Sequence, residues 1–181
     1  KNKIGSGDIT WLKMLDKVGS KGKTVIIASG ASDIEEVVRA VKQLSKYNID
    51  IIRPSIIDDY NQIFSRDIGF VIDDYFIISN TLPQRSKEIL AIDKVLVQIP
   101  KNKIIQLPEE CHIEGGDVIN FNNYLFIGYY EKKNYSKLYT ARTNKNAIDF
   151  FKKFFPKKII KPFHLNKSNT IPEKNALHLD C

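Results

Sequence analysis

The sequence predicts an α/β fold in which a unit of β-hairpin, helix and strand is repeated in a propeller-like array. Apolar, β-rich runs occur in pairs separated by two-residue turns, and a helix candidate and a further strand follow each pair. The whole unit recurs about fifty residues later. A repeat of this length indicates units that bury their apolar surfaces against their neighbours.

A β-α-β segment is expected ahead of the repeats. The pattern predicts a strand at 24–28, a helix from about Asp33 to Tyr47 and a buried strand at 50–53 that Pro54 ends. Ser32 and Glu35 have the spacing of a capping box. One helical face carries the apolar residues Ile34, Val37, Val38, Val41 and Leu44.

The two copies of the unit can be placed along the chain. The first has expected strands at 69–72 and 75–79, a helix at 84–95 and a strand at 103–107; the second has them at 118–121, 124–128, 144–155 and 157–163. The acidic residue that enters the hairpin is Asp67 in the first copy and Asp117 in the second. Asp180 stands where a third copy would begin, so the array has an open edge at Cys181.

The composition is that of an ordinary soluble globular protein. The 181 residues are 43% hydrophobic and 27% charged, and no apolar run approaches the roughly 18 residues that a membrane span needs. The net charge is +7, but the basic run 151–161 alternates with apolar residues suited to burial, which favours a packed helix and strand over a nucleic-acid site. We expect a cytoplasmic protein with no nucleic-acid or membrane partner. Self-association stays open.

Acidic side chains are the first candidates for a site. Asp67, Glu114, Asp117 and Asp180 all lie at or before strand starts in equivalent places, so the repeat could bring them together around one axis. Carboxylates that converge need a cation, because unpaired like charges are costly. That cation is either a metal ion or an organic cation such as a guanidinium.

Two further features lie close to these acids in the sequence. Gly115-Gly116 indicates either a close backbone approach or positive φ beside a ligand, or a simple turn. His178 lies two residues before Asp180, so in an extended segment both side chains point to one face. Imidazole suits general acid/base work near neutral pH, although a structural role is the alternative. We expect His112 and His164 to be structural.

Four ordered segments resemble the motifs of the pentein, or guanidino-group modifying, superfamily, which includes arginine deiminases, dimethylarginine dimethylaminohydrolases and glycine amidinotransferases. The segments are Phe64-Ser65-Arg66-Asp67 with Gly69-Phe70-Val71-Ile72, His112-Ile113-Glu114-Gly115-Gly116-Asp117-Val118, Ala141-Arg142-Thr143-Asn144 and Leu177-His178-Leu179-Asp180-Cys181. The resemblance spans about two thirds of the chain. It implies a pentein-type propeller, with residues 1–181 as a single, partial catalytic domain that lacks its final units.

The resemblance also implies roles for the acidic residues and the histidine. Asp67 matches a carboxylate that grips guanidinium nitrogens, and Asp180 matches a second one. Glu114 matches the acid that holds the guanidinium beside the catalytic histidine. His178 matches the general acid/base, while Asp117 is expected to be structural or to support these residues.

Two arginines match groups that bind the substrate's carboxylate. Arg142 has the planar fork suited to an α-carboxylate. Arg85 could be the other clamp, with a solvent-exposed role at a helix start as the alternative. No cofactor and no metal are implied, because the organic guanidinium itself would occupy the carboxylate cluster.

The chemistry implied by the resemblance is covalent. A cysteine thiolate attacks the guanidinium carbon, His178 protonates the departing amine, and water or an acceptor amine resolves the amidino-cysteine. The family's nucleophile belongs to a last repeat that this chain does not reach. Cys181 and Cys111 are instead expected to be inert residues of the packed fold.

The leading functional prediction is hydrolysis of a guanidino carbon–nitrogen bond in arginine or a related compound. Amidino transfer from arginine to an amine is a close alternative, and the sequence does not decide between them or name the substrate. A non-catalytic pentein-like binding protein, such as one that attaches to ribosomal subunits, is a third reading. A metal-dependent hydrolase is weaker, because only His178 has acidic company.

Overall fold

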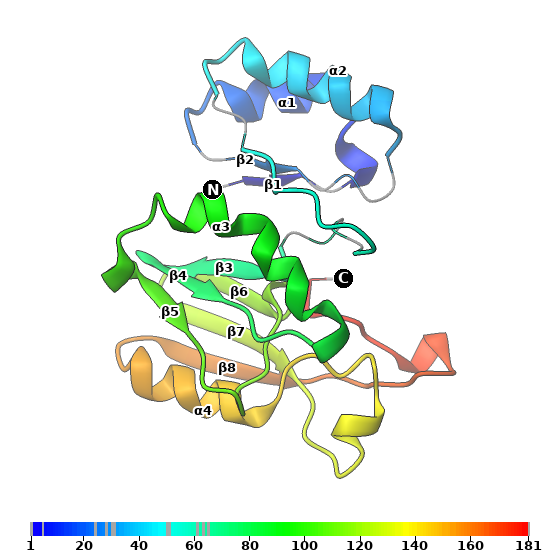
Figure 1. Ribbon diagram of the computed structural model, residues 1–181, viewed down its shortest axis with the longest axis vertical. Coiled ribbons are helices and arrows are strands. Elements are labelled where there is room, and N and C mark those ends of the chain that lie inside the picture. Colours follow the sequence, from blue (N-terminus) through cyan, green and yellow to red (C-terminus); the bar gives the residue numbers. More distant parts are fainter. Residues whose placement is uncertain are drawn as a thin grey trace. The chain divides into compact units, whose positions relative to one another are not determined.

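The computed structural model describes residues 2–4, 6–23, 25–27, 29, 32–49, 52–60, 62, 64 and 66–180. These residues form two compact units (Figure 1): unit 1 is Lys1–Pro54 with Asn61–Ser65, and unit 2 is Ser55–Tyr60 with Arg66–Cys181. The single, partial catalytic domain that we predicted over residues 1–181 stays a prediction. That further catalytic units follow residue 181 stays a prediction.

Unit 1 is a small βαβα arrangement. Strands β1 (Asn2–Ile4) and β2 (Val25–Ile27) pair in parallel, with Ile4 opposite Ile27. Helices α1 (Leu12–Gly19) and α2 (Ile34–Ser45) lie together on one side of this pair (Figure 1). The core of the unit consists of Ile4, Ile9, Leu15, Ala40 and Leu44. We did not predict β1 or α1.

Two expectations in unit 1 were wrong. The capping box of α2 is formed by Asp33 and Glu36, one residue later than predicted: Asp33 Oδ1 accepts from Glu36 N–H at 2.7 Å, and Glu36 Oε2 accepts from Asp33 N–H at 3.1 Å. Ile34 and Val38, which we predicted on the apolar face of this helix, are 75% and 54% exposed. The predicted strand at 50–53 is absent at Ile52 and Arg53, which are irregular and exposed.

Four predicted strand residues of unit 1 lie outside the described residues: Thr24, Ala28, Asp50 and Ile51.

Unit 2 contains the two predicted repeats. Strands β3 (Gly69–Ile72), β4 (Tyr75–Ile78) and β5 (Ile104–Gln106) form one sheet, and β6 (Val118–Phe121), β7 (Tyr124–Tyr129) and β8 (Ile159–His164) form another. Both sheets have an antiparallel hairpin followed by a parallel third strand. Asp73 and Asn122 open the turns at φ 51° and 53°, in the left-handed region that Asp and Asn tolerate. The repeated hairpins are therefore confirmed.

The helices of the two repeats differ. In the second repeat α4 (Lys145–Phe154) is an α-helix, and the side chain of Asn144 caps it by accepting from Ala147 N–H. In the first repeat the predicted α-helix is a 3₁₀-helix, η2 (Pro83–Ile92), followed by the short α3 (Asp93–Leu96). Three residues per turn align positions i and i+3, which suits the ion pair of Arg85 with Glu88.

Short 3₁₀ turns occur elsewhere in the chain, at η1 (Ser6–Asp8), η3 (Lys101–Lys103), η4 (Gly115–Asp117), η5 (Tyr135–Lys137) and η6 (Pro172–Lys174).

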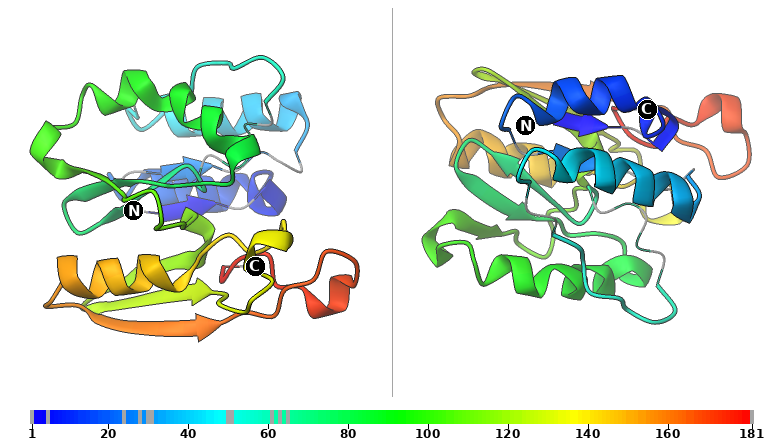
Figure 2. Two further views of the ribbon diagram at one scale, coloured as in Figure 1. Left: turned by 60° about the horizontal axis from the view of Figure 1, so that its bottom comes forward. Right: turned by 90° about the horizontal axis from the view of Figure 1, so that it is seen from above.

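The core of unit 2 lies between its two sheets. Helix α4 packs on its own sheet and also contacts the preceding one, where the rings of Phe151 and Phe70 are 6.2 Å apart and those of Phe154 and Tyr75 are 5.6 Å apart. Figure 2 shows α4 alongside β7 and β8. Both sheets of unit 2 have three strands in open order, so a closed propeller stays a prediction.

Within the described residues, no helix has the length and apolar character to span a bilayer.

Candidate active site

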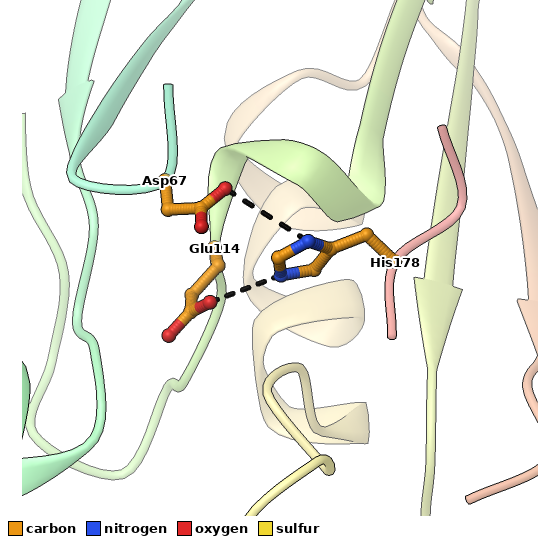
Figure 3. Close-up of side chains that lie close together, drawn as sticks. All are labelled: Asp67, Glu114 and His178. Carbon is orange, nitrogen blue, oxygen red and sulfur yellow. Dashed lines mark hydrogen bonds and ion pairs between the residues drawn. The ribbon is translucent and has the colours of Figure 1, made fainter. Parts of the chain in front are cut away.

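Two carboxylates and one imidazole converge inside unit 2 (Figure 3). His178 Nε2 lies 3.0 Å from Glu114 Oε2, and His178 Nδ1 lies 3.9 Å from Asp67 Oδ1. Asp67 precedes β3, Glu114 precedes η4, and His178 follows η6. All three side chains are buried, and Glu114 has no exposed surface at all. The prediction that acids at the repeat starts meet is confirmed for Asp67 and Glu114.

A guanidinium group already lies between these two acids. Arg85 Nη1 donates to Glu114 Oε2 at 3.0 Å and to Asp67 Oδ2 at 3.3 Å. The other side of the Arg85 fork is held by Glu88, whose two carboxylate oxygens accept at 3.0 and 2.8 Å. Arg85 is therefore bound within the acidic cluster, and the solvent-exposed alternative for it was wrong.

Arg142 completes the environment of Glu114. Its Nη1 donates to Glu114 Oε1 at 2.9 Å, so both oxygens of this buried carboxylate carry charge-assisted hydrogen bonds. Burial alone would raise the pKa of Glu114, but the His178 hydrogen bond and the charges of Arg142 and Arg85 outweigh it and lower the pKa. Glu114 is therefore held as a carboxylate.

Burial and the neighbouring charged groups shift the pKa values of His178 and Asp67. Burial tends to lower the pKa of His178, but its hydrogen bond to Glu114 and the negative charges of Asp67 and Asp117 raise the pKa above its usual 6.5. Burial raises the pKa of Asp67, with the Glu114 charge adding to it and His178 and Arg85 opposing it. The cluster thus favours a protonated imidazole that can give up a proton.

Gly115 and Gly116 serve a close backbone approach and not a positive-φ turn. A Cβ on Gly115 would lie 2.0 Å from the carbonyl oxygen of Arg66, and one on Gly116 would lie 2.6 Å from the His178 ring. Neither glycine is in the left-handed region. Their missing side chains let the segments that carry Asp67 and His178 reach Glu114.

Asp117 holds the histidine segment in place. Its Oδ1 accepts from Leu179 N–H at 3.2 Å, and its Oδ2 accepts from the Thr143 hydroxyl at 2.6 Å. Burial raises the pKa of this carboxyl to about 6, although the Thr143 hydrogen bond opposes the rise. Asp117 points to the neighbour of His178 and not to Asp67, which agrees with a supporting position.

The Arg142-Thr143-Asn144 motif joins the site to the fold. While Arg142 binds Glu114, the Thr143 hydroxyl accepts from Glu114 N–H at 3.4 Å and Asn144 Oδ1 accepts from His112 N–H at 3.2 Å. Asn144 also caps α4. Consecutive residues therefore fix the Glu114 segment, and the sequence reasoning missed the roles of Thr143 and Asn144.

Asp180 has a different partner from the one that its sequence position suggested. It does not belong to the group of Asp67, Glu114 and His178 whose candidate ligand atoms lie within 4.8 Å of one another. Its Oδ2 accepts from Arg66 Nε at 2.7 Å, and Arg66 also donates to Val118 O. Asp180 thus binds a guanidinium of the chain itself, and a contact with substrate stays a prediction.

Lys167 was also missed at the sequence level. Its ammonium donates to the carbonyls of Ala176 and Leu177 at 2.7 and 2.8 Å, directly before His178. With Asp117 bound to Leu179 N–H, the histidine is anchored on both sides. No sequence motif indicated Lys167, because its ammonium binds backbone carbonyls nine and ten residues away.

We expected neither cysteine to be the nucleophile. Of the two, the structure describes only Cys111. Cys111 is buried, and burial together with the charge of Glu110 raises the pKa of its thiol, so it is not activated. Cys181 lies outside the described residues.

Two buried polar atoms near the cluster have no hydrogen-bond partner within the described chain: Arg142 Nε and the Tyr135 hydroxyl. Tyr135 feels the negative charges of Glu114 and Asp117, which act with burial to raise its pKa. Buried polar groups are normally satisfied, so both atoms are available to a ligand.

Comparisons with known proteins give a family match for the first part of the chain and similar proteins for most of its length. Residues 1–60 match the model of the NeuB family, which is 60 of 181 residues and lies outside the repeats. The chain is also similar to the uncharacterized protein YkgA of Bacillus subtilis, with 30% identity over 147 residues. That match covers 79% of this chain and 44% of YkgA, so the chain spans less than half the length of this relative.

Solved structures similar to the chain belong to guanidino-group modifying enzymes. The amidinotransferase SxtG of Microseira wollei, from the saxitoxin biosynthetic pathway, matches with a TM-score of 0.59 and 15% identity, covering 81% of this chain and 50% of SxtG. ArgZ, an arginine dihydrolase of the cyanobacterial ornithine–ammonia cycle, matches with a TM-score of 0.51 and 13% identity, covering 90% and 22%. These likenesses show the mixed α/β fold of the pentein superfamily.

Proposed function

We propose that unit 2 carries the guanidinium-binding and acid/base groups of an enzyme that modifies guanidino compounds. The observation that carries this proposal is Arg85 Nη1, which Asp67 and Glu114 hold together inside the protein. These two carboxylates therefore have the separation and orientation that a guanidinium nitrogen needs. The pentein-type fold and the enzymes that share it point to the same chemistry.

Substrate binding requires Asp67 to exchange one guanidinium for another. Glu88 grips Arg85 through Nε and Nη2, so Arg85 Nη1 can release Asp67 without loss of the whole side chain from the site. Arg142 stays bound to Glu114 through Nη1 and offers its unpaired Nε to a negatively charged group of the substrate. The site thus suits a molecule with a guanidinium at one end and a carboxylate at the other.

The reaction that fits these groups proceeds through a covalent intermediate. A thiolate would attack the guanidinium carbon, the carbon–nitrogen bond would break, and His178 would give its proton to the departing amine. Water would then add to the amidino-cysteine carbon, return a proton to the imidazole and release a ureido product with the thiolate. The described residues supply no activated thiol, so the proposal assigns the nucleophile to further sequence of a longer protein.

Hydrolysis of arginine or a related compound is the leading reaction. Amidino transfer is the alternative, and it differs only in that an amine replaces water in the second step. Because YkgA is longer than this chain, its full-length form is the suitable protein for the assay. Release of citrulline and ammonia from L-arginine would support hydrolysis, and ornithine release that depends on added glycine would support transfer.

A binding test on the 181-residue chain addresses the proposal directly. Calorimetric titration with L-arginine should give saturable heat, and Asp67→Asn should weaken the affinity at least tenfold. Asp74→Asn is the matched control, because this carboxylate is highly exposed in a turn. A folded chain that gives no heat with L-arginine would favour a non-catalytic binding protein. Loss of activity of YkgA in a chelator would favour a metal, which Asp67, Glu114 and His178 could ligate.

A further inference from the structure

A surface pocket lies at the end of unit 2 where both hairpins turn. Its walls come from the β3–β4 turn, the β6–β7 turn and the end of α4. The volume is about 660 Å³, which is within the range of small-molecule sites. We call it the turn pocket and define it by the residues that offer contacts to a ligand: Tyr75, Asn122, Asn123, Phe154, Phe155 and Lys157.

The turn pocket is separate from the cluster around His178. Asp67 precedes β3, whereas Tyr75 follows the turn at the other end of that strand. In the same way Asp117 precedes β6 and Asn122 follows it. A four-residue strand is roughly 13 Å long. The cluster and the pocket therefore lie at opposite ends of the strands, and a ligand of the pocket does not depend on guanidino chemistry.

Three aromatic rings form the apolar part of the turn pocket. The Tyr75 ring meets the rings of Phe154 and Phe155 edge-on, at centroid distances of 5.6 and 5.9 Å. Phe155 is buried, whereas Phe154 is 43% exposed, so an aromatic surface stays open at the pocket. A flat ring that stacks there buries apolar area and gains from ring–ring contact.

The lysine at the base of the pocket is occupied by the fold. The side chain of Lys158 is 7% exposed. Its ammonium donates to Asp73 Oδ1 at 2.6 Å, to Asn120 Oδ1 at 2.9 Å and to the Asn122 carbonyl at 2.8 Å. These acceptors use all three ammonium protons, and the contact with Asp73 neutralises that carboxylate. Neither Lys158 nor Asp73 therefore selects the charge of a ligand.

The polar groups that remain define the ligand. Lys157 is exposed and forms no ion pair within the described residues, so it leaves one positive charge at the pocket. The side-chain amides of Asn122 and Asn123 also have no hydrogen-bond partner in the described part of the chain. Each amide offers a donor and an acceptor. A ligand that uses these groups has donors and acceptors on its edge and carries a negative charge.

We propose that the turn pocket binds a flat heteroaromatic compound with an anionic group, which is the chemistry of a purine mononucleotide. The ring stacks on Phe154 and Tyr75, its edge forms hydrogen bonds with Asn122 and Asn123, and the anion binds Lys157. A purely apolar ligand would leave the amides and the ammonium unused. A simple anion would leave the aromatic surface unused.

The test uses AMP as the probe, with adenosine as the compound that lacks the phosphate and ribose 5-phosphate as the one that lacks the ring. Binding to the 181-residue chain is followed through the backbone amide NMR signals of Asn122 and Asn123. AMP should shift these signals saturably. Adenosine should bind at least threefold more weakly than AMP, and ribose 5-phosphate at least tenfold more weakly.

Two variants separate the contributions of the ring and the charge. Phe154→Ser should weaken AMP binding at least tenfold, because the stacking surface is lost. Lys157→Gln should remove the advantage of AMP over adenosine. Phe163→Ser is the matched control, because Phe163 is a 46% exposed aromatic residue of β8 outside the pocket, and it should leave AMP binding unchanged.

Circular dichroism of every variant shows whether the chain is folded. The proposal would be overturned if AMP gave no saturable shift in the folded wild-type chain, or if Phe154→Ser bound AMP as tightly as the wild type. Equal binding of ribose 5-phosphate and AMP would also overturn it, since the site would then recognise phosphate alone. Equal binding of adenosine and AMP would overturn the anion contact with Lys157.

Discussion

The two repeats of unit 2 share their strand order and hairpin turns, but they differ in how far one equivalent face of each sheet is buried. Ile77 in the first repeat is fully buried against α4, whereas its counterpart Phe126 is half-buried, on the sheet face that also carries the exposed Phe121 and Phe163. Asp67 and Asp117 also hold equivalent places in sequence. Asp67 faces His178, while Asp117 binds the backbone beside it. Equal positions in a repeat therefore do not imply equal roles, because each repeat has different neighbours.

The largest expected effect concerns the two faces. Ile77→Ala should lower the free energy of unfolding of unit 2 by about 3–4 kcal/mol, because it leaves a cavity in a packed core. Phe126→Ala should cost less than about 1 kcal/mol, because Phe126 is only half-buried and lies beside the exposed Phe121 and Phe163. Urea unfolding followed through the amide NMR signals of Leu125 and Ile127 measures both. Similar costs for the two variants would contradict the assignment of a covered and an open face.

The second prediction concerns the two acids. In the folded chain the pKa of Asp117 is raised from 3.8 to about 6, so the protonated form is favoured by folding. The stability that this group contributes is therefore present below pH 3.8 and is lost as the pH rises to about 6. The gap corresponds to about 3 kcal/mol.

Asp117→Asn should remove that pH dependence and preserve the hydrogen bond to Leu179 N–H. The free energies of unfolding of the wild type and of Asp117→Asn are measured at pH 4 and at pH 7. Both proteins contain the other titrating groups, including Asp67, Glu114 and His178. Asp67→Asn serves as the control. It should weaken L-arginine binding directly, whereas Asp117→Asn should weaken binding only by displacing His178. Identical pH profiles for wild type and Asp117→Asn would refute the prediction.

The smallest expected effect distinguishes the two helices. Asn144→Ala should cost about 1–2 kcal/mol, because α4 loses its N-cap and the His112 segment loses an acceptor. The helix η2 has no such side-chain cap at Leu82. Asn123→Ala, in the β6–β7 turn, is the matched control and should cost less than about 0.5 kcal/mol. Thermal unfolding of both variants by circular dichroism tests the difference.

The hairpins were predictable because their signals are local. The apolar, β-rich runs at 118–121 and 124–128 indicate two strands, and Asn122 suits the turn through its tolerance of positive φ. The helix of the first repeat was only half predictable. Its boundaries follow from the apolar spacing, but the 3₁₀ geometry has no signal in that spacing. Arg85 within this helix binds Asp67 and Glu114, which are distant in sequence.

The site was predictable to the extent that the repeat encodes it. The equivalent starts of the two repeats, together with the resemblance to the guanidino-modifying enzymes, predict that Asp67, Glu114 and His178 form one group. Asp180 extended the same pattern but binds Arg66, because the side-chain partner is chosen by tertiary contacts. Lys167 acts on backbone carbonyls, which leave no signature in sequence.

Unit 1 was the least predictable region. β1 has three residues, of which only Ile4 is apolar, so no strand pattern can be recognised there. The NeuB family model matches residues 1–60, ahead of the first hairpin. The difference shows that a β-α-β pattern alone did not reveal where one compact unit ends and the next begins.

The most direct measurement is an NMR titration of the His178 imidazole with L-arginine and with L-citrulline, its neutral counterpart, in the 181-residue chain at pH 7. If Asp67 and Glu114 bind a flat organic cation, L-arginine shifts the His178 signals saturably, citrulline does not, and Asp67→Asn weakens the effect at least tenfold. The account would be contradicted if the His178 signals of the folded chain did not change with L-arginine, or if they changed equally with citrulline.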